Sequence, residues 1–288
     1  MFGLGLSTAR QVAKKIFSPI RIRDLVVWYD FGDKRTIYTD AGTTNVSSDG
    51  DKVYRITNKA NANSSKILRS SIGAYLEQST AANRPVWRAA SGGCVAFSNS
   101  LSDTQKLYCS KSVGNTATNS LSATTVNGQN LTVFYVAQAN GSTVGSDEYL
   151  MNIFGANIAD RISIYVDNDT NDRWQSHVAN NTARSNTVVN CGQNLTTDKE
   201  VWCVGFQQNS RFYRNNNTAD GTTSGSSDDH DIDLSTNDAG IKLSIGEPTG
   251  IGTTGFNGKV FEFLIFDRAL STGEEKLVNT YLRQKHKI

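Results

Sequence analysis

Three aspartates follow the end of an expected strand in the segment YVDNDTNDRW, at Asp167, Asp169 and Asp172. Their spacing places several hard oxygen atoms on one short loop, and such oxygens are the ligands that Ca²⁺ takes. The segment lacks the glycine and the distal glutamate of an EF-hand loop. A turn in which aspartate and asparagine side chains bond to the local backbone accounts for the same residues. The sequence therefore predicts either a calcium site or a polar turn.

Aromatic side chains beside amides and charged groups form a second kind of candidate site. A ring can stack on the apolar face of a sugar while the polar groups bind its hydroxyls. Trp174, which lies between Arg173 and Gln175, is the first candidate for this role. Tyr213, in an arginine-containing segment with Asn215, is the second. Packing against the rest of the protein is the alternative for Trp174.

Groups for catalysis are few. The three histidines, His177, His230 and His286, have no candidate nucleophile beside them, and the G-x-S-x-G turn of many hydrolases is absent. No strand-like segment carries the paired carboxylates with which sandwich glycosidases flank the sugar bond. We therefore expect a protein that is not an enzyme, with a polysaccharide-degrading enzyme of the same fold as the alternative.

Composition and charge narrow the class of protein further. The 288-residue chain is rich in Ser, Thr and Asn, with 24 glycines and only 3 prolines, which suits short strands joined by polar turns. Residues 1–23 carry five basic and no acidic residues, so most of the chain is slightly acidic although the net charge is +2. That distribution argues against nucleic-acid binding by the main domain. No apolar run approaches the roughly 20 residues of a membrane span.

The basic N-terminus is expected to form a short amphipathic helix over residues 6–17. Leu6, Ile16 and Phe17 fall on one face, and Arg10 and Lys14 on another. Such a short helix is unstable alone in water, so it needs a partner surface. Its own domain, a sister subunit, a neighbouring protein and a membrane surface are the alternatives. We expect a helical arm over residues 1–21 that docks the protein, and homo-oligomerisation.

The N-terminus does not have the pattern of a secretory signal, because its charges follow its first apolar residues and no apolar h-region comes next. We expect the protein to remain in the cell that makes it or to leave as part of a particle. The four cysteines have no metal-binding spacing, and a buried free thiol is expected for Cys203 in an apolar strand.

Ten or more short strand-like segments run from residue 22 onward, beginning with IRDLVVWYDF at 22–31. They predict a two-sheet sandwich over residues 22–288. The stretch 215–240 has few large apolar residues and is expected to be an exposed loop within that domain. Glu262 is the lone acid on one face of the apolar strand KVFEFLIFD. It is either a ligand-binding group or a strand residue that pairs with a nearby Lys or Arg or lies near the sheet margin.

Both faces of KVFEFLIFD are apolar, so it is expected to be a central strand covered on both sides. Strict alternation would place Phe261 with Phe263 and Ile265 on one face. The helix that follows should begin at a capping box of Ser271 and Glu274. Its apolar stripe, which should dock on the sandwich, consists of Leu277, Val278, Tyr281 and Leu282.

This C-terminal segment resembles the closing signature of concanavalin A-like (laminin-G-like) jelly-roll domains. The opening SPIRIRDLVVWYDFGD and the segments NRPVW and GGCVAFSNS are similar to such domains in bacteriophage structural proteins, so the resemblance covers about residues 19–285. The signature residues are Phe256, Gly258, Val260, Glu262, Leu264, Phe266, Arg268, Leu270, Ser271, Glu274, Tyr281, Leu282 and Lys285.

The resemblance implies an all-β fold, a two-sheet antiparallel jelly-roll sandwich with an N-terminal helical arm and a short C-terminal helix. It also implies a virion structural protein of the tail, fibre or capsid-decoration kind. In such a particle the arm would contact other virion proteins, and the sandwich would face outward to bind a host-surface glycan or stabilise the particle.

Overall fold

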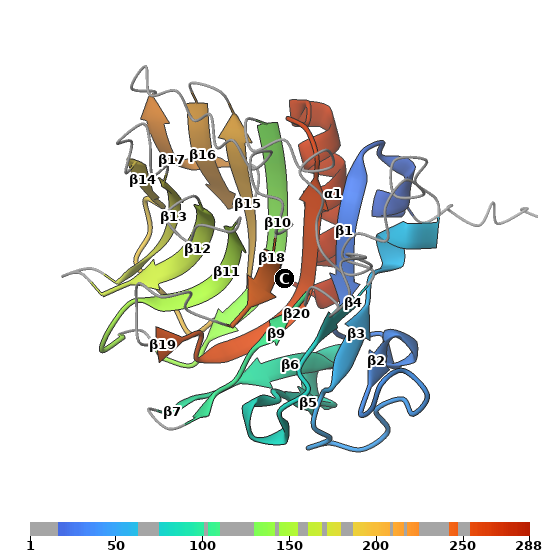
Figure 1. Ribbon diagram of the computed structural model, residues 1–288. Coiled ribbons are helices and arrows are strands. Elements are labelled where there is room, and N and C mark those ends of the chain that lie inside the picture. Colours follow the sequence, from blue (N-terminus) through green and yellow to red (C-terminus); the bar gives the residue numbers. More distant parts are fainter. Residues whose placement is uncertain are drawn as a thin grey trace, which may run out of the picture.

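The computed structural model describes residues 17–62, 75–100, 103–109, 130–141, 144–154, 161–168, 172–179, 187–207, 210–215, 218–224, 242–246 and 254–288. Two large β-sheets face each other, as Figure 1 shows, and a single α-helix ends the chain. Most strand pairs are antiparallel. The predicted all-β, two-sheet antiparallel sandwich with a C-terminal helix is therefore confirmed. Of the predicted arm over residues 1–21, the structure describes only residues 17–21, in which Pro19–Arg21 form a 3₁₀ turn.

The eight-stranded sheet has the order β17-β16-β15-β10-β20-β6-β5, with β1 also paired to β20. Its strands are β1 (Leu25–Asp30), β5 (Val86–Arg88), β6 (Cys94–Phe97), β10 (Asn130–Ala139), β15 (Glu200–Gln207), β16 (Ser210–Asn215), β17 (Thr218–Ser224) and β20 (Gly258–Phe266). The expected loop over 215–240 is therefore wrong for its first part, where β17 pairs with β16 despite its polar sequence. Backbone hydrogen bonding in a sheet does not require apolar side chains.

The ten-stranded sheet has the order β14-β13-β12-β11-β18-β9-β4-β3-β2, with β19 beside β11. Its strands are β2 (Ile37–Tyr38), β3 (Arg55–Thr57), β4 (Tyr75–Glu77), β9 (Leu107–Tyr108), β11 (Glu148–Phe154), β12 (Arg161–Asp167), β13 (Arg173–Ala179), β14 (Thr187–Asn190), β18 (Lys242–Ile245) and β19 (Thr254–Gly255).

The small elements complete the chain. Strands β7 (Asn99–Ser100) and β8 (Asp103–Thr104) form a ribbon, and 3₁₀ turns lie at η1 (Pro19–Arg21), η2 (Lys34–Thr36), η3 (Lys59–Ala62), η5 (Ala81–Asn83) and η6 (Ala90–Gly92). The C-terminal helix α1 spans Thr272–His286. Within the part of the chain that the structure describes, no helix combines the length and the apolar character that a membrane span needs.

Strand β20 is central, as predicted, between β10 on one side and β1 and β6 on the other. Its faces differ from strict alternation, because Val136 of β10 pairs with Glu262 and the next residue pairs with Val260. Phe261 is the extra residue of this β-bulge, and a bulge shifts which face the residues before it occupy. Phe261 therefore packs under the helix, and Val260 takes its place between the sheets.

Helix α1 covers the outer face of the eight-stranded sheet. The predicted capping box is present: the Ser271 Oγ accepts from the Glu274 backbone, and the Glu274 carboxylate accepts from the Ser271 backbone. Val278 and Leu282 are buried against the sheet, and Tyr281 packs beside them. Leu277 is 49% exposed, so the predicted stripe is wrong at that residue, which lies one position away from the buried face.

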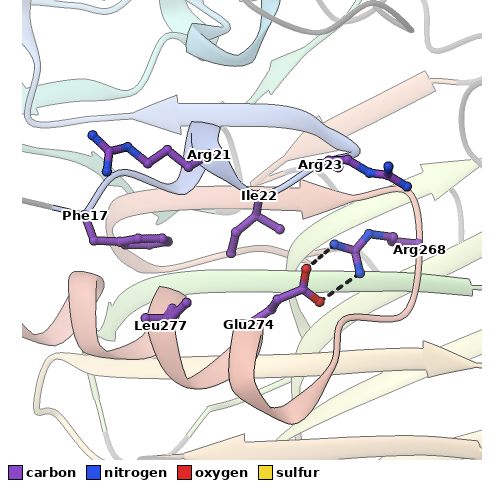
Figure 2. Close-up of a pocket in the computed structure, with 7 residues that line it drawn as sticks. All are labelled: Phe17, Arg21, Ile22, Arg23, Arg268, Glu274 and Leu277. Atoms are coloured by element: carbon purple, nitrogen blue, oxygen red, sulfur yellow. Dashed lines mark hydrogen bonds and ion pairs between the residues drawn. The ribbon is translucent and has the colours of Figure 1, made fainter.

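Phe17 is the one residue of the predicted amphipathic helix, residues 6–17, that the structure describes, since Leu6, Arg10, Lys14 and Ile16 lie outside the described ranges. Its ring lies against the helix, 6.3 Å from the Tyr281 ring centroid and edge-on to it (Figure 2). The end of the arm segment therefore packs on the domain itself. No described residue tests the rest of the arm or its expected partners.

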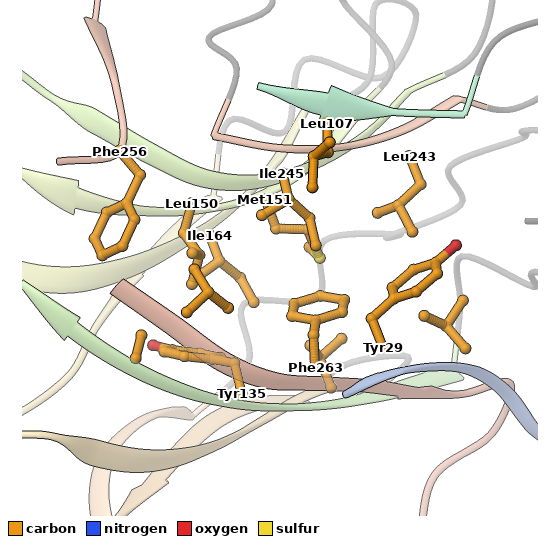
Figure 3. Close-up of a cluster of buried hydrophobic side chains, with 14 of the residues drawn as sticks. Tyr29, Leu107, Tyr135, Leu150, Met151, Ile164, Leu243, Ile245, Phe256 and Phe263 are labelled. Carbon is orange, nitrogen blue, oxygen red and sulfur yellow. The ribbon is translucent and has the colours of Figure 1, made fainter. Parts of the chain in front are cut away.

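The main hydrophobic core lies between the two sheets (Figure 3). Phe263 and Tyr135 project from the eight-stranded sheet toward Met151 and Ile245 of the other sheet. All four cysteines are free and buried, as expected for Cys203. Burial raises the pKa of both Cys94 and Cys191 to about 11, so these thiols stay protonated at neutral pH.

Candidate functional site

Trp174 lies in this core and presents no ring face to solvent. It is 1% exposed, with its ring centroid 5.1 Å from that of Tyr135 and 5.8 Å from that of Phe256. Its Nε1 donates to Glu200 Oε2 at 3.2 Å. Sugar stacking on Trp174 is therefore wrong, and the alternative of internal packing holds. The cause is strand alternation on β13, which turns Trp174 inward and its two neighbours outward.

Those neighbours, Arg173 and Gln175, belong to the outer face of the ten-stranded sheet. Gln175 is buried, and its Oε1 accepts from the Tyr165 hydroxyl at 2.6 Å. Its Nε2 donates to the Asp167 carboxylate. The Tyr165 ring stacks on that of Tyr149 with centroids 4.9 Å apart. This outer face therefore carries aromatic and polar side chains together, as a sugar site requires.

The second aromatic candidate belongs to the other sheet. Tyr213 and Asn215 lie on β16 and pair in register with Val204 and Trp202 of β15. Trp174 and Tyr213 thus sit on strands of different sheets, and the structure does not combine them in one face.

Two of the three aspartates, Asp167 and Asp172, lie at the facing ends of the paired strands β12 and β13. Asp167 ends β12 opposite Arg173, the first residue of β13. Asp172 has a left-handed φ of 37°, and its Oδ1 lies 3.4 Å from the Val144 nitrogen, which donates to it. Asp169 lies outside the described residues. No group of three metal-binding side chains occurs in the described ranges, and calcium binding at this turn stays a prediction.

A row of polar side chains crosses the outer face of the ten-stranded sheet. Each member pairs in register with the next, on eight successive strands from β2 to β13. The residues between them, such as Ile56, Leu76 and Ile162, point into the core. We call this set the polar row; it consists of Tyr38, Arg55, Glu77, Tyr108, Ser244, Asn152, Ser163 and His177.

The two ends of the polar row differ in burial. Ser244, Asn152 and Ser163 are 0% exposed, whereas Tyr38 and Arg55 are half-buried. At the buried end the Ser163 hydroxyl donates to Asn152 Oδ1 at 2.6 Å. The Ser244 hydroxyl has no hydrogen-bond partner among the described residues. A ligand can therefore approach from the half-buried end.

Tyrosines surround an arginine at that half-buried end. The Arg55 guanidinium lies 3.9 Å from the centroid of the Tyr75 ring and 5.8 Å from that of Tyr54. It forms an ion pair with Glu77 at 2.9 Å. Burial and the neighbouring Glu77 raise the pKa of Tyr75. We call Tyr38, Tyr54, Arg55, Tyr75 and Glu77 the tyrosine–arginine patch.

The side chains of the patch are of the types that bind ligands by stacking and hydrogen bonding. Its rings offer flat apolar surface, and its guanidinium donates in a planar fork that suits carboxylates and hydroxyls. Its carboxylate, Glu77, is engaged by Arg55. Such a set recognises a ligand by stacking and hydrogen bonding.

Sequence reasoning did not find this patch, because its residues come from short strands far apart in the chain. Arg55 and Tyr108 lie on strands of three and two residues, and strands this short give no strong alternation in sequence. The sequence signal that could have found the patch is an apolar residue between two polar ones, as in Tyr75-Leu76-Glu77, since such a triplet marks a short strand with one polar face.

Comparison with known proteins shows fold likeness only. No protein-family profile matches the chain, and no curated protein matches it in sequence. A Ruminococcus gnavus IT-sialidase CBM40 bound to α2,3-sialyllactose is similar over 65% of this chain and 95% of its own, with 11% identity and a TM-score of 0.47. A heptameric SAP-like pentraxin from Limulus polyphemus is similar over 64% and 80%, with 17% identity and a TM-score of 0.46.

A Trypanosoma rangeli sialidase in complex with 2,3-difluorosialic acid is similar over 91% of this chain but only 33% of its own length, with 10% identity and a TM-score of 0.48. At these identities and scores the likenesses carry no argument about ligand or reaction. The fold assignment rests on the two sheets, their strand order and the helix that covers one of them.

Proposed function

We propose that this protein is a carbohydrate-binding jelly-roll module that holds a glycan on its tyrosine–arginine patch without cleaving it. The observation that carries the proposal is the Arg55 guanidinium 3.9 Å from the Tyr75 ring on a half-buried sheet face. Stacking of a sugar on such a ring fits the general make-up of ligand sites, in which aromatic surface is combined with a few oriented polar groups.

We extend this proposal to a structural role in a virion, with the arm held by other virion proteins and the sandwich facing outward. Its support is the resemblance of the chain to phage jelly-roll modules and the basic charge of residues 1–23. Mass spectrometry of purified particles tests it. Stoichiometric copies in the particle are expected, and the presence of the protein only as a free monomer would contradict the role.

A glycan array probed with the full chain tests the binding function. Selective signal is expected on a small set of glycans. It should fall about five- to thirtyfold in Tyr75→Ala, since loss of one stacked ring removes roughly 1–2 kcal/mol, comparable to aromatic contacts elsewhere. Tyr75→Phe keeps the ring and should keep most of the signal.

Arg55→Ala should also weaken binding, and Arg88→Ala is its matched control. Arg88 likewise pairs with a carboxylate, Asp49 at 3.1 Å, but it lies on β5 of the other sheet. A flat array, or equal signal from Tyr75→Ala and the unmodified protein, would sink the proposal. Release of reducing ends from a bound polysaccharide would favour the alternative of a polysaccharide-degrading enzyme.

A further inference from the structure

A hollow of about 580 Å³ lies between the N-terminal segment and the first turns of α1 (Figure 2). Phe17 and Ile22 reach it from the N-terminal side, and Leu277 and Glu274 from the helix. Arg21 and Arg23 lie toward its two ends in this view, and Arg268 lies beside Glu274. The hollow is on the opposite sheet from the polar row and is separate from the proposed glycan site.

The hollow is lined by apolar side chains that the fold leaves partly exposed to solvent. Leu277 is 49% exposed there and is the only large apolar side chain left exposed among the residues whose burial the structure describes. Phe17 is half-buried beside it. Burying a leucine side chain gains roughly 1.5–3 kcal/mol, so an apolar group entering this hollow would be stabilised by contact with both.

The charges around the hollow are mostly positive and only partly neutralised. Arg268 is satisfied, with Nη2 2.5 Å from Glu274 Oε1 and Nε 3.5 Å from Asp24. Arg21 and Arg23 are exposed, and neither forms an ion pair within the described part of the chain. Two guanidinium groups therefore stand beside an apolar cavity with no carboxylate assigned to them.

We propose that this hollow docks an acidic segment of a partner protein, with one aliphatic side chain inserted between Phe17 and Leu277. Flanking carboxylates of that segment would pair with Arg21 and Arg23. The combination of a buried apolar anchor and charged groups around it is how protein interfaces commonly divide affinity and orientation.

The charges exclude the nearest alternative occupant, the chain's own N-terminal arm. Residues 1–20 contain basic but no acidic side chains, so the arm would bring like charge to Arg21 and Arg23. An anionic membrane would satisfy the arginines, but membrane binding favours apolar groups that project outward, whereas Phe17, Ile22 and Leu277 line a hollow.

Fluorescence anisotropy with the full chain and a labelled peptide tests the proposal. The probe is an acetylated peptide with one leucine between two pairs of aspartates. One comparison peptide has serine in place of the leucine, and a second has lysines in place of the aspartates. The first probe should bind at least about tenfold more tightly than either comparison peptide, because both the anchor and the charges are required.

Variants of the protein then locate the binding. The double variant Arg21→Glu, Arg23→Glu should lose at least about tenfold in affinity through like-charge repulsion, and Leu277→Ser should lose several-fold. All three positions are exposed, so the variants are expected to fold. The control variant Arg35→Glu, Arg88→Glu changes two other exposed arginines and should bind the probe as the unmodified protein does.

Five outcomes would overturn the proposal. Equal binding of the leucine and serine peptides would mean charge attraction alone, and no binding of either would mean no such site. Displacement of the probe by a synthetic peptide of residues 1–16 would make the arm the occupant. Self-association that the Arg21→Glu, Arg23→Glu variant abolishes would make a second copy the occupant. Binding to phosphatidylglycerol vesicles without peptide binding would indicate a membrane surface.

Discussion

On the outer face of the eight-stranded sheet, Glu262 is fully buried under α1 and accepts hydrogen bonds from Trp28 Nε1 and Lys285 Nζ, each at 2.7 Å. On the outer face of the ten-stranded sheet, Ser244 is equally buried, but its hydroxyl has no partner among the described residues. Leaving a buried polar group unpaired costs about 1–3 kcal/mol. The first face is thus closed by hydrogen bonds and ion pairs under the helix, whereas the second holds a buried hydroxyl that no described residue pairs.

The closed face contains a network of charges that joins four elements. Lys285 of α1 lies 2.7 Å from both Glu262 of β20 and Asp30 of β1, and Lys59 of η3 also lies 2.7 Å from Asp30. Burial opposes the ionisation of Asp30, but the two lysines outweigh it and hold its pKa below the usual value. Glu262 is thus the partner of a nearby lysine, one of the two alternatives that its sequence context left open.

The largest effect is expected on this closed face. Glu262→Ala should lower the free energy of unfolding by about 3–5 kcal/mol, because it removes one member of a buried ionic network and leaves its partners uncompensated. Urea unfolding followed by tryptophan fluorescence measures the change. A loss below about 1 kcal/mol would show that the network contributes little and that the comparison between the faces is wrong.

Glu148 sharpens the comparison, because it is a buried carboxylate that forms no ion pair with any residue that the structure describes. It accepts from the Asn257 nitrogen at 3.0 Å, and burial raises its pKa to about 7. The folded protein therefore binds a proton that the unfolded chain releases near the ordinary value of about 4.3. Stability should fall as pH rises from about 4.5 to 7, by roughly 1–2 kcal/mol after allowance for partial solvent screening.

Urea midpoints measured across that pH interval check this expectation. Glu148→Gln cannot titrate and should lack this part of the pH dependence. Asp30 is not expected to contribute in this range: its depressed pKa gives stability that is present above the unfolded value and is lost only in more acidic solution. An unchanged slope in Glu148→Gln would contradict the assignment.

Ser244→Ala tests the outer face of the ten-stranded sheet. Removing an unpaired buried hydroxyl should leave the unfolding free energy unchanged or raise it by up to about 1 kcal/mol, because no hydrogen bond is lost. Glycan affinity is expected to stay unchanged, because Ser244 is fully buried and the proposed glycan site lies at the half-buried end of the polar row. Thermal unfolding combined with binding to a glycan found on the array measures both quantities. A clear destabilisation would mean that the hydroxyl has a structural role.

Only a small effect is expected at the half-buried end of the polar row. Glu77→Ala removes the ion pair between Glu77 and Arg55, two side chains that are each about one-fifth exposed. It should lower the free energy of unfolding by about 1 kcal/mol or less. The matched comparison is Glu262→Ala, which removes the same functional group from a fully buried site. Equal losses in the two variants would remove the distinction between the faces.

Much of the fold was predictable because it depends on local patterns. The apolar run of β20, the capping box at Ser271 and Glu274, and the alternating strands are all visible in short segments. For the candidate site, the sequence predicted the types of side chain but not the residues. The sequence predicted a sugar site from an aromatic residue with polar residues beside it. It predicted Trp174 as the stacking ring, but the alternation of side chains on β13 turns that ring into the core.

The sequence by itself determined the class of the fold, because strand period, turn composition and helix capping are properties of neighbouring residues. It also determined that the N-terminal segment is basic. Only the tertiary structure decided which polar residues share a face, because register between distant strands aligns Arg55, Glu77 and Tyr108 across the ten-stranded sheet. It likewise decided that Glu262 is structural, since its partners Trp28 and Lys285 meet it only when β1 and α1 pack on β20.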